Sequence, residues 1–186
     1  MKLNITHENV YKFQNGNEEF TIRQLKVDDP VNEITDLLHR AYKQLGDLGF
    51  RYLATHQDDV ETQRRLDNGT SYLALHKEKI IATITLYSNK SDNNSEFYKR
   101  KGVVHFGQFG IDPQYQKKGI GKILMDMIEI KARDSGASEI ALDTAEGADH
   151  LIKFYEKRGY EIIEYVQWEV TNYRSVIMSK KFYNEL

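Results

Sequence analysis

The chain has 186 residues, which is long enough for one domain with a complete core and short for two. Its net charge of −2 gives no overall field that attracts nucleic acid or an anionic membrane, and the absence of cysteine excludes disulfides and Cys-based zinc sites. The N-terminus lacks the apolar run of a signal peptide, and no segment has the length of a membrane span. We therefore expect a cytoplasmic single domain over residues 1–186, with no metal and no nucleic-acid or membrane partner.

The N-terminal part of the chain predicts an extension, a strand and a long helix. Residues 1–18 are polar and are expected to add a strand or hairpin to the domain. Alternating apolar residues over 20–27 predict the first strand proper. An acid as N-cap, Asp28 or Asp29, followed by Pro30 as the first helical residue, predicts a helix that ends near residue 46 or 49.

The next segment predicts a loop, a short helix and a β-hairpin. The loop, 48–57, is rich in aromatic residues, and Asp58 or Asp59 is placed to cap the helix that follows it. Two β-rich segments, 71–76 and 80–87, then predict a tight hairpin.

The polar segment 88–102 predicts a mobile surface loop, and a strand is expected over 103–112. This strand carries Gly107 and Gly110. Glycine inside a strand usually marks a bulge or the close approach of a ligand or another backbone.

The C-terminal third predicts a helix over 120–133, a short strand over 140–142 and a helix over 149–157. Two β segments, 160–170 and 175–180, are expected to form an antiparallel pair. Hairpins and helices both occur, so the fold class is α/β (α+β) with a mixed sheet.

The loop 116–121, Gln-Lys-Lys-Gly-Ile-Gly, joins the glycine-bearing strand to the helix after it. Its glycines permit close approach of the backbone, and the first turn of the helix offers unpaired N–H groups at the positive end of its dipole. Lys117, Lys118 and Lys122 add positive charge, so the loop predicts a pyrophosphate site, although a helix start that binds nothing is the alternative. A Walker phosphate loop needs a hydroxyl where Ile123 stands, and the dinucleotide fingerprint needs a third glycine.

Two segments of the sequence indicate which kind of pyrophosphate ligand the 116–121 loop binds. The strand end 109–113, Phe-Gly-Ile-Asp-Pro, followed by the 116–121 loop, resembles the coenzyme A site of the GNAT (GCN5-related) N-acetyltransferase superfamily. The segment 154–160, Phe-Tyr-Glu-Lys-Arg-Gly-Tyr, resembles a second motif of that superfamily, and the element order matches over roughly residues 19–181. The resemblance implies a mixed, mostly antiparallel sheet flanked by helices and splayed between its fourth and fifth strands. It also implies an enzyme that moves the acetyl group of acetyl-CoA to a primary amine by direct attack in a ternary complex.

The resemblance further implies how coenzyme A is held. Backbone groups at the end of the fourth strand would pair with the pantetheine arm, and N–H groups of the 116–121 loop would hold the pyrophosphate. Many members carry an asparagine seven residues before the motif tyrosine, where this chain has Ala148, so that contact is lost or is supplied by Thr144 or His150. The expected coenzyme-binding residues are Phe109, Gly110, Ile111, Gln116, Lys117, Lys118, Gly119, Ile120, Gly121, Lys122, Thr144 and His150.

Two residues are expected to be catalytic. Tyr155 matches the family tyrosine beside the coenzyme sulfur, and a phenol can protonate the thiolate that leaves when an amine attacks a thioester. His105 is the first candidate for the base that deprotonates the amine, and Asp143 is the second. If no bulge intervenes, His105 and Gly107 share a face of their strand with Phe109. The alternatives are a core tyrosine and a hydrogen-bonded strand histidine.

The acceptor would lie between the first two helices and the last two strands, and its identity stays open. The aromatic and polar residues brought there are Tyr42, Asp47, Phe50, Tyr52, His56, Tyr165, Trp168 and Tyr173. We expect Tyr42, Phe50, Tyr52 and Trp168 to contact the acceptor, with a role in the core as the alternative. Two other functions stay possible, namely a non-catalytic acyl-CoA-binding or sensing module and a partner-binding GNAT-like domain. The chain is expected to be a monomer or a homodimer.

Overall fold

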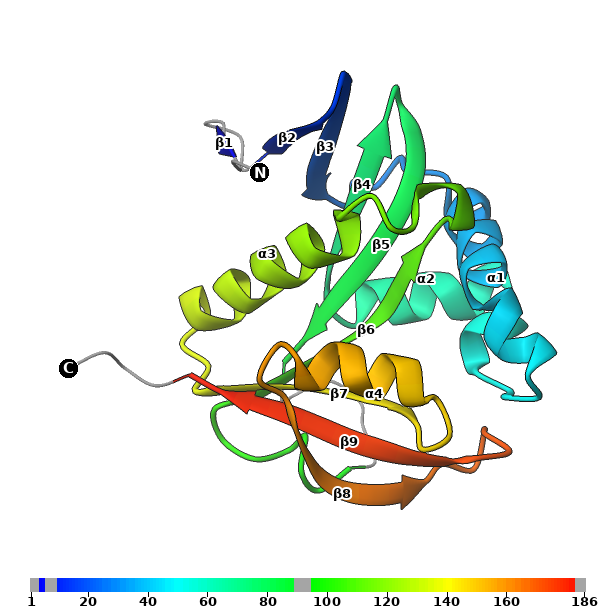
Figure 1. Cartoon of the computed structure of the whole chain (residues 1–186), viewed down its shortest axis with the longest axis vertical. Helices are drawn as coiled ribbons and strands as arrows, with labels where there is room; N and C mark the ends of the chain where they lie inside the picture. The colour runs from blue at the N-terminus through cyan, green and yellow to red at the C-terminus, as the bar shows by residue number, and fades with distance from the viewer. Residues whose placement is uncertain (1–3, 6–9, 89–94, 183–186) are drawn as a thin grey trace.

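The computed structural model describes residues 4–5, 10–88 and 95–182. Over these residues, nine strands form one sheet in the order β1-β2-β3-β4-β5-β6-β7-β9-β8, and neighbouring strands are antiparallel except for the parallel pair β6–β7 (Figure 1). The strands are β1 (Asn4–Ile5), β2 (Tyr11–Asn15), β3 (Glu18–Gln24), β4 (Thr70–His76), β5 (Lys79–Tyr87), β6 (Val103–Ile111), β7 (Glu139–Ala145), β8 (Glu161–Gln167) and β9 (Arg174–Lys181). The predicted mixed, mostly antiparallel sheet is confirmed.

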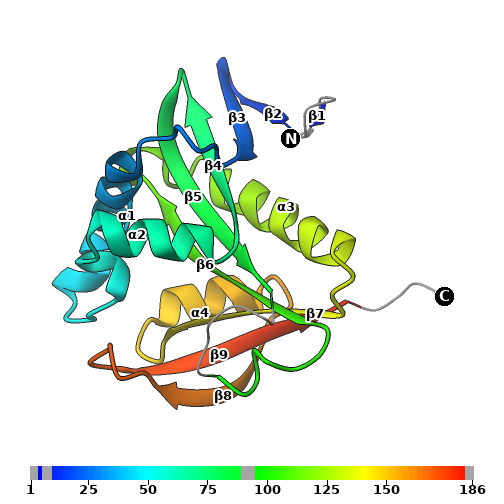
Figure 2. The ribbon, with the colours of Figure 1, turned by 180° about the vertical axis from the view of Figure 1, so that it is seen from behind.

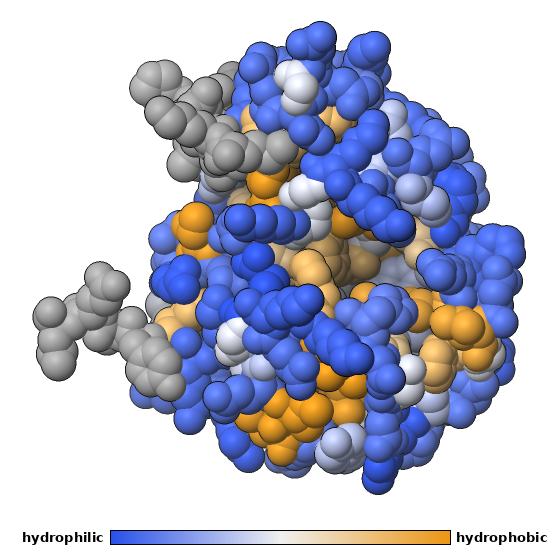
Figure 3. Space-filling model, in the orientation of Figure 1, coloured by the Kyte–Doolittle hydropathy of each residue, from blue (hydrophilic) through white to orange (hydrophobic). Residues whose placement is uncertain are grey.

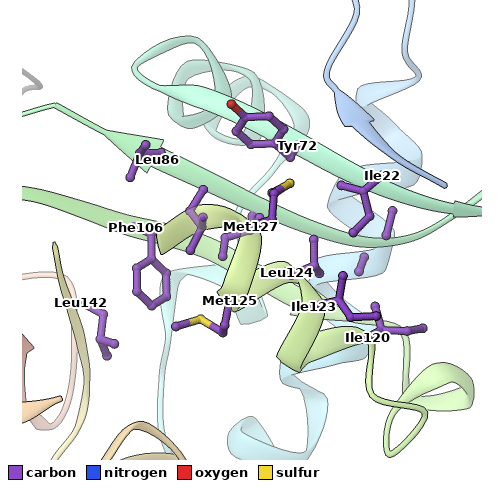
Figure 4. Close-up of a cluster of buried hydrophobic side chains, with 14 of the residues drawn as sticks. Ile22, Tyr72, Leu86, Phe106, Ile120, Ile123, Leu124, Met125, Met127 and Leu142 are labelled. Atoms are coloured by element: carbon purple, nitrogen blue, oxygen red, sulfur yellow. The ribbon is translucent and has the colours of Figure 1, made fainter. Parts of the chain in front are cut away.

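Helices cover both faces of the sheet. They are α1 (Val31–Asp47), α2 (Asp59–Asp67), α3 (Ile120–Asp134) and α4 (Asp149–Glu156). Helices α3 and α4 lie in front of the sheet in Figure 1, and α1 and α2 lie in front of it in the view from behind in Figure 2. The main apolar core lies between α3 and the sheet, and the side chains of Leu124 and Met127 point toward strands that carry Ile22, Tyr72 and Leu86 (Figure 4).

The sheet opens between β6 and β7. These strands pair only from Val103–Glu139 to His105–Ala141. Beyond this point β6 continues to pair with β5 alone and β7 with β9 alone. The splay that the family resemblance implied is therefore present, and it leaves backbone groups of both strands without a neighbouring strand.

A β-bulge in β6 decides which side chains face which side of the splay. Thr83 and Thr85 of β5 pair with Gly110 and Gly107, so β6 contains one extra residue, and Gln108 has a φ of 49°. His105 and Gly107 therefore face α2, whereas Phe109 lies with the core residues under α3. His105 was expected to share a face with Phe109 only if no bulge intervened; the bulge reverses the alternation and puts them on opposite faces.

The start of α1 also differs from the prediction. Pro30 is the N-cap residue and has no side-chain cap, so an acidic cap was the wrong assignment. The Asp29 carboxylate instead accepts hydrogen bonds from the Arg23 guanidinium at 2.6 and 2.7 Å and from the Lys26 N–H at 2.7 Å. At α2 the prediction is confirmed, since the Asp58 carboxylate accepts from the Glu61 N–H at 2.8 Å.

The described part of the expected surface loop 88–102 is only partly on the surface. Ser95, Phe97 and Tyr98 are buried, and Phe97 and Tyr98 form a small core with residues of β6, β7 and β9. Residues 89–94 lie outside the described part of the chain. The prediction of a surface loop was based on the polar composition of this segment and overlooked the burial of Phe97 and Tyr98.

Candidate functional site

The splay between β6 and β7 opens into a cavity of about 560 Å³, here called the central cavity. Figure 3 shows this face of the molecule hollowed near its centre, between polar side chains. The residues predicted from sequence that line the central cavity are Tyr42, Tyr52, Phe109, Gly110, Ile111, Gln116, Lys117, Gly119, Gly121, Lys122, Thr144, Tyr155 and Trp168. The predicted residues outside its lining are Phe50, His105, Lys118, Ile120 and His150.

At one end of the central cavity, the 116–121 loop leads into α3. Gly119 is the N-cap residue in the left-handed conformation, with a φ of 78°, and no side chain caps the helix. Its carbonyl accepts the first helical hydrogen bond, from the Ile123 N–H, so the N–H groups of Gly121 and Lys122 are left without a partner inside the helix. A left-handed glycine, unpaired N–H groups and lysines together fit a pyrophosphate.

The two glycines that sequence reasoning assigned to coenzyme approach are explained by packing. A Cβ on Gly110 would lie 3.1 Å from Leu38 and 3.3 Å from Ala41, so this glycine allows α1 to pack on β6. A Cβ on Gly121 would lie 3.0 Å from the Ile111 Cδ1, so this glycine allows α3 to pack on the same strand. Both glycines therefore bring a helix close to β6.

Lys118 is tied to the N-terminal extension. Its ammonium lies 3.1 Å from the Glu18 carboxylate and 5.0 Å from the centre of the Tyr115 ring. The Asn15 side-chain amide donates to the Lys118 carbonyl at 3.1 Å. The β2–β3 hairpin thus braces the 116–121 loop, a role that the sequence did not indicate. Ile120 is buried in the core, which leaves only its backbone for a ligand.

Tyr155 lies on α4 at the wall of the central cavity, and its ring packs against Phe106, Phe154 and Tyr160. Burial raises the pKa of its hydroxyl well above the usual value. Within the described residues the hydroxyl has no hydrogen-bond partner. The ring therefore belongs to the core, and the hydroxyl is a protonated donor beside the cavity, so the two interpretations of this residue are compatible.

Two tyrosines that were expected to contact the acceptor hold the splayed strands. The Tyr42 hydroxyl donates to the Phe109 carbonyl of β6 at 3.1 Å. The Tyr52 hydroxyl lies 2.9 Å from the Thr144 Oγ1 and accepts from the Ala145 N–H of β7 at 2.9 Å. Their rings also contact each other, with centres 5.3 Å apart. This tyrosine pair bridges the two strands across the central cavity.

Three further predicted positions contribute differently. The Phe50 ring packs against Tyr52 and Tyr173, behind the cavity wall. His150 is an exposed residue near the start of α4. Ala148, at the position of the family asparagine, is buried. Of the two suggested replacements for the missing asparagine, only Thr144 lines the cavity.

His105 lines a second cavity of about 470 Å³, here called the adjoining cavity, on the α2 side of the splay. The imidazole is stacked between the rings of Tyr98 and Tyr87, with ring centres 4.2 and 5.0 Å away. Burial lowers the pKa of His105 to about 3. A histidine with this pKa is neutral near pH 7 and is a weak acceptor of protons.

Asp143 occupies the point where the two cavities meet, since it lines both. Its carboxylate accepts from the Trp168 indole N–H at 3.0 Å and from the Tyr98 hydroxyl at 3.3 Å. Water can reach it through the cavities although protein surrounds it, and burial raises its pKa above the usual value for an aspartate. The two pKa shifts run against the order of these candidates expected from sequence, since the shift makes Asp143 a stronger proton acceptor than an ordinary aspartate and His105 a weaker one than an ordinary histidine.

Sequence reasoning missed Arg65, which also lines both cavities. It lies on the short helix α2 beside a second arginine, and no local pattern distinguishes the two. Within the described residues there is no cluster of His, Asp and Glu that could hold a metal ion. The described helices include none that is both long and apolar enough to cross a membrane.

Comparison with known proteins bears directly on this geometry. The model of the acetyltransferase (GNAT) family matches residues 31–160, which include α1, β6, β7 and the tyrosine of α4. The chain belongs to the GNAT acetyltransferase family. The match covers the segments that carry the 116–121 loop and Tyr155, so the resemblance described from the sequence is confirmed.

Individual GNAT relatives are similar over most of the chain. The chain is 32% identical to the S-(2-succino)cysteine N-acetyltransferase of Bacillus subtilis, over 74% of this chain and 82% of the relative. A Pyrococcus horikoshii protein of known structure superposes with a TM-score of 0.69 at 21% identity, over 88% of this chain and 99% of its own. A GNAT acetyltransferase from Elizabethkingia anophelis, solved with acetyl-CoA bound, superposes with a TM-score of 0.62 at 17% identity, over 88% and 98%. The family and the Bacillus relative support an acyltransferase.

Proposed function

We propose that the protein is an N-acetyltransferase that transfers the acetyl group of acetyl-CoA to the primary amine of a small acceptor. The observation that carries the proposal is that the central and adjoining cavities share lining residues. The 116–121 loop is at one end, Tyr155 is on the wall, and Asp143 is at the junction with the adjoining cavity. Acetyl-CoA would enter the central cavity, and the acceptor would approach from the adjoining cavity on the other side of the splay.

The residues of the central cavity fit coenzyme A in kind and position. The unpaired N–H groups of Gly121 and Lys122 suit its pyrophosphate. The apolar wall formed by Phe109, Ile111 and Phe154 suits the pantetheine arm, and the free edge of β6 offers backbone groups for pairing with it. The acetyl-CoA complex of the Elizabethkingia structure supports the same co-substrate.

The proposed chemistry assigns one role to each of two residues. Asp143, directly or through a water molecule, accepts one proton from the ammonium group of the acceptor, and the amine nitrogen then bonds to the thioester carbonyl carbon. The carbon–sulfur bond breaks with its electron pair on sulfur. Tyr155 donates its proton to that sulfur and regains one from the nitrogen. The products are the N-acetylated amine, the coenzyme A thiol and one proton, which Asp143 returns to solvent.

The relative from Bacillus subtilis is named for acetylating a substituted cysteine, which supports a small molecule as the acceptor here. The test incubates the protein with acetyl-CoA and a panel of amino acids, polyamines and peptides, and measures free thiol release and acetylated product by mass spectrometry. We expect at least one small amine to release thiol well above the hydrolysis background. Binding of coenzyme A without turnover on any amine would favour a sensing module instead. A cytoplasmic location and a monomeric or homodimeric state stay predictions from the sequence.

A further inference from the structure

We propose that Arg65 binds a carboxylate of the acceptor, so that the enzyme selects amino acids, or other amines that carry a carboxylate near the amine, over simple amines. The inference rests on the proposed N-acetyltransferase function and adds a residue that determines specificity. Three observations carry it: the place of Arg65, the partners of its guanidinium, and the aspartate that lines the same cavities.

The Arg65 side chain extends from α2 toward β6 where the sheet opens. It lines both the central and the adjoining cavity and is half-buried. Its Nη2 lies 3.9 Å from the point that a Cβ on Gly107 would occupy, and at Gly107 β6 has already separated from β7. Its charge partly offsets the rise in pKa that burial causes at Tyr87 and Asp143. The guanidinium is therefore within electrostatic range of the point where acyl transfer would occur.

A neutral, buried chain of side chains holds this guanidinium in place. The Arg65 Nη1 donates to the Gln57 Oε1 at 2.7 Å. Gln57 is 2% exposed, and its amide donates to the Thr62 Oγ1 at 2.7 Å. The Thr35 hydroxyl donates in turn to Thr62 at 2.9 Å. Three side chains thus position one arginine without neutralising it.

No carboxylate of residues 10–88 or 95–182 forms an ion pair with Arg65. Its neighbour Arg64 differs, because it is more exposed and donates two hydrogen bonds, of 2.7 and 2.8 Å, to the Glu61 carboxylate. A half-buried arginine that lines a cavity and has only neutral partners leaves donors for a ligand carboxylate, which a guanidinium binds through two parallel hydrogen bonds.

Asp143, on β7, lines the same two cavities and does not form an ion pair with Arg65, on α2. A site that is lined by one carboxylate and one guanidinium, not paired with each other, complements the ammonium and carboxylate groups of an amino acid. In this pose the ammonium points to Asp143, near Tyr155, and the carboxylate points to Arg65. The Trp168 side chain, which donates to Asp143, closes the site on the side of β8.

The test compares S-benzylcysteine with S-benzylcysteamine, which lacks only the carboxylate. We expect the wild-type kcat/KM to be about 10- to 100-fold higher for the amino acid, as a charge-assisted bidentate contact implies. Arg65→Gln should remove this preference by raising KM for the amino acid, so that the ratio of the two kcat/KM values falls to about one. Arg64→Gln, on the same helix, should keep the preference. Retention of the preference in Arg65→Gln would overturn the proposal, whatever the result for Arg64→Gln.

A binding measurement separates this inference from the proposed function. Calorimetry on wild-type protein and Arg65→Gln would use N-acetyl-S-benzylcysteine and N-acetyl-S-benzylcysteamine as ligands, and it needs no turnover. We expect wild-type protein to bind the carboxylate-bearing product at least 10-fold more tightly, and Arg65→Gln to bind both equally. Equal binding by wild-type protein would refute the carboxylate site. Selective binding without turnover would refute the proposed N-acetyltransferase activity but support the carboxylate site at Arg65.

Discussion

Replacing Tyr155 by phenylalanine removes a single hydroxyl from the wall of the central cavity and keeps the ring that packs against Phe106, Phe154 and Tyr160. Within the described residues that hydroxyl has no hydrogen-bond partner, so its removal leaves no buried group unsatisfied. We therefore expect the free energy of unfolding to change by less than about 1 kcal/mol. The effect should fall on the chemical step alone.

Its size follows from the role of the proton. A positioned general acid contributes roughly 10²- to 10⁴-fold to the rate. Burial raises the Tyr155 pKa well above its usual value, so the donor stays protonated throughout the working pH range of the enzyme. Tyr155→Phe should lower kcat by about 100-fold or more. The KM for acetyl-CoA should change little, because the pyrophosphate site at the 116–121 loop is intact.

The assay measures thiol release over pH 6–9 with saturating amine, together with coenzyme A affinity by calorimetry and unfolding by thermal melt. In wild-type protein we expect no loss of activity from tyrosine ionisation over this range. A kcat within twofold of wild type, with normal folding and coenzyme binding, would refute the assignment of Tyr155 as the proton donor. Tyr160→Phe is a matched control, because Tyr160 does not line the central cavity and its hydroxyl donates to Glu129 instead.

Asp143→Asn should lower kcat/KM by about 100-fold and abolish the acidic limb of the pH–rate profile. Burial raises the Asp143 pKa, so the activity of wild-type protein should fall as the pH drops through a value above the ordinary aspartate pKa of about 4. An acidic limb that is unchanged in Asp143→Asn would contradict the role of Asp143 as the base. His105 should stay neutral by NMR down to about pH 3, and the free energy of unfolding should fall as pH drops below about 6.5, because the unfolded histidine then binds a proton that the folded one does not. A ring that titrates near pH 6.5 in the folded protein would restore His105 as a candidate base. Gly119→Ala puts a Cβ on a residue with a φ of 78° and no neighbouring atom within 4 Å, so strain alone should cost about 1–2 kcal/mol in a thermal melt and weaken coenzyme A binding. Unchanged stability would show that this φ is not needed.

Local patterns in the sequence predicted much of the fold and one end of the site. The 116–121 loop and the position of Tyr155 depend on a glycine at a helix start and on the spacing of residues along one helix. Such features are fixed by residues within one or two turns of each other, so a pattern can reveal them. The order of strands and helices and the family followed from the same signals.

Contacts between distant segments decided the rest. The glycines of β6 indicated a bulge or a close approach, but only the folded structure showed that the extra residue lies at Gln108 and puts His105 and Phe109 on opposite faces. Asp29 is of a residue type that often caps helices, but its carboxylate pairs with Arg23 of the preceding strand instead. In each case the local sequence allows more than one arrangement, and contacts with distant parts of the folded chain decide which one forms.

The candidate site itself shows most clearly which features local sequence predicts and which depend on the folded structure. By itself the sequence predicted the proposed donor, because the 116–121 loop and the motif around Tyr155 each consist of residues close together in the chain. Only the tertiary structure brought Arg65 of α2 and Asp143 of β7 into the lining of the same two cavities. Their juxtaposition depends on the splay between β6 and β7 and on the buried chain from Gln57 to Thr35, and these are properties of the folded chain as a whole.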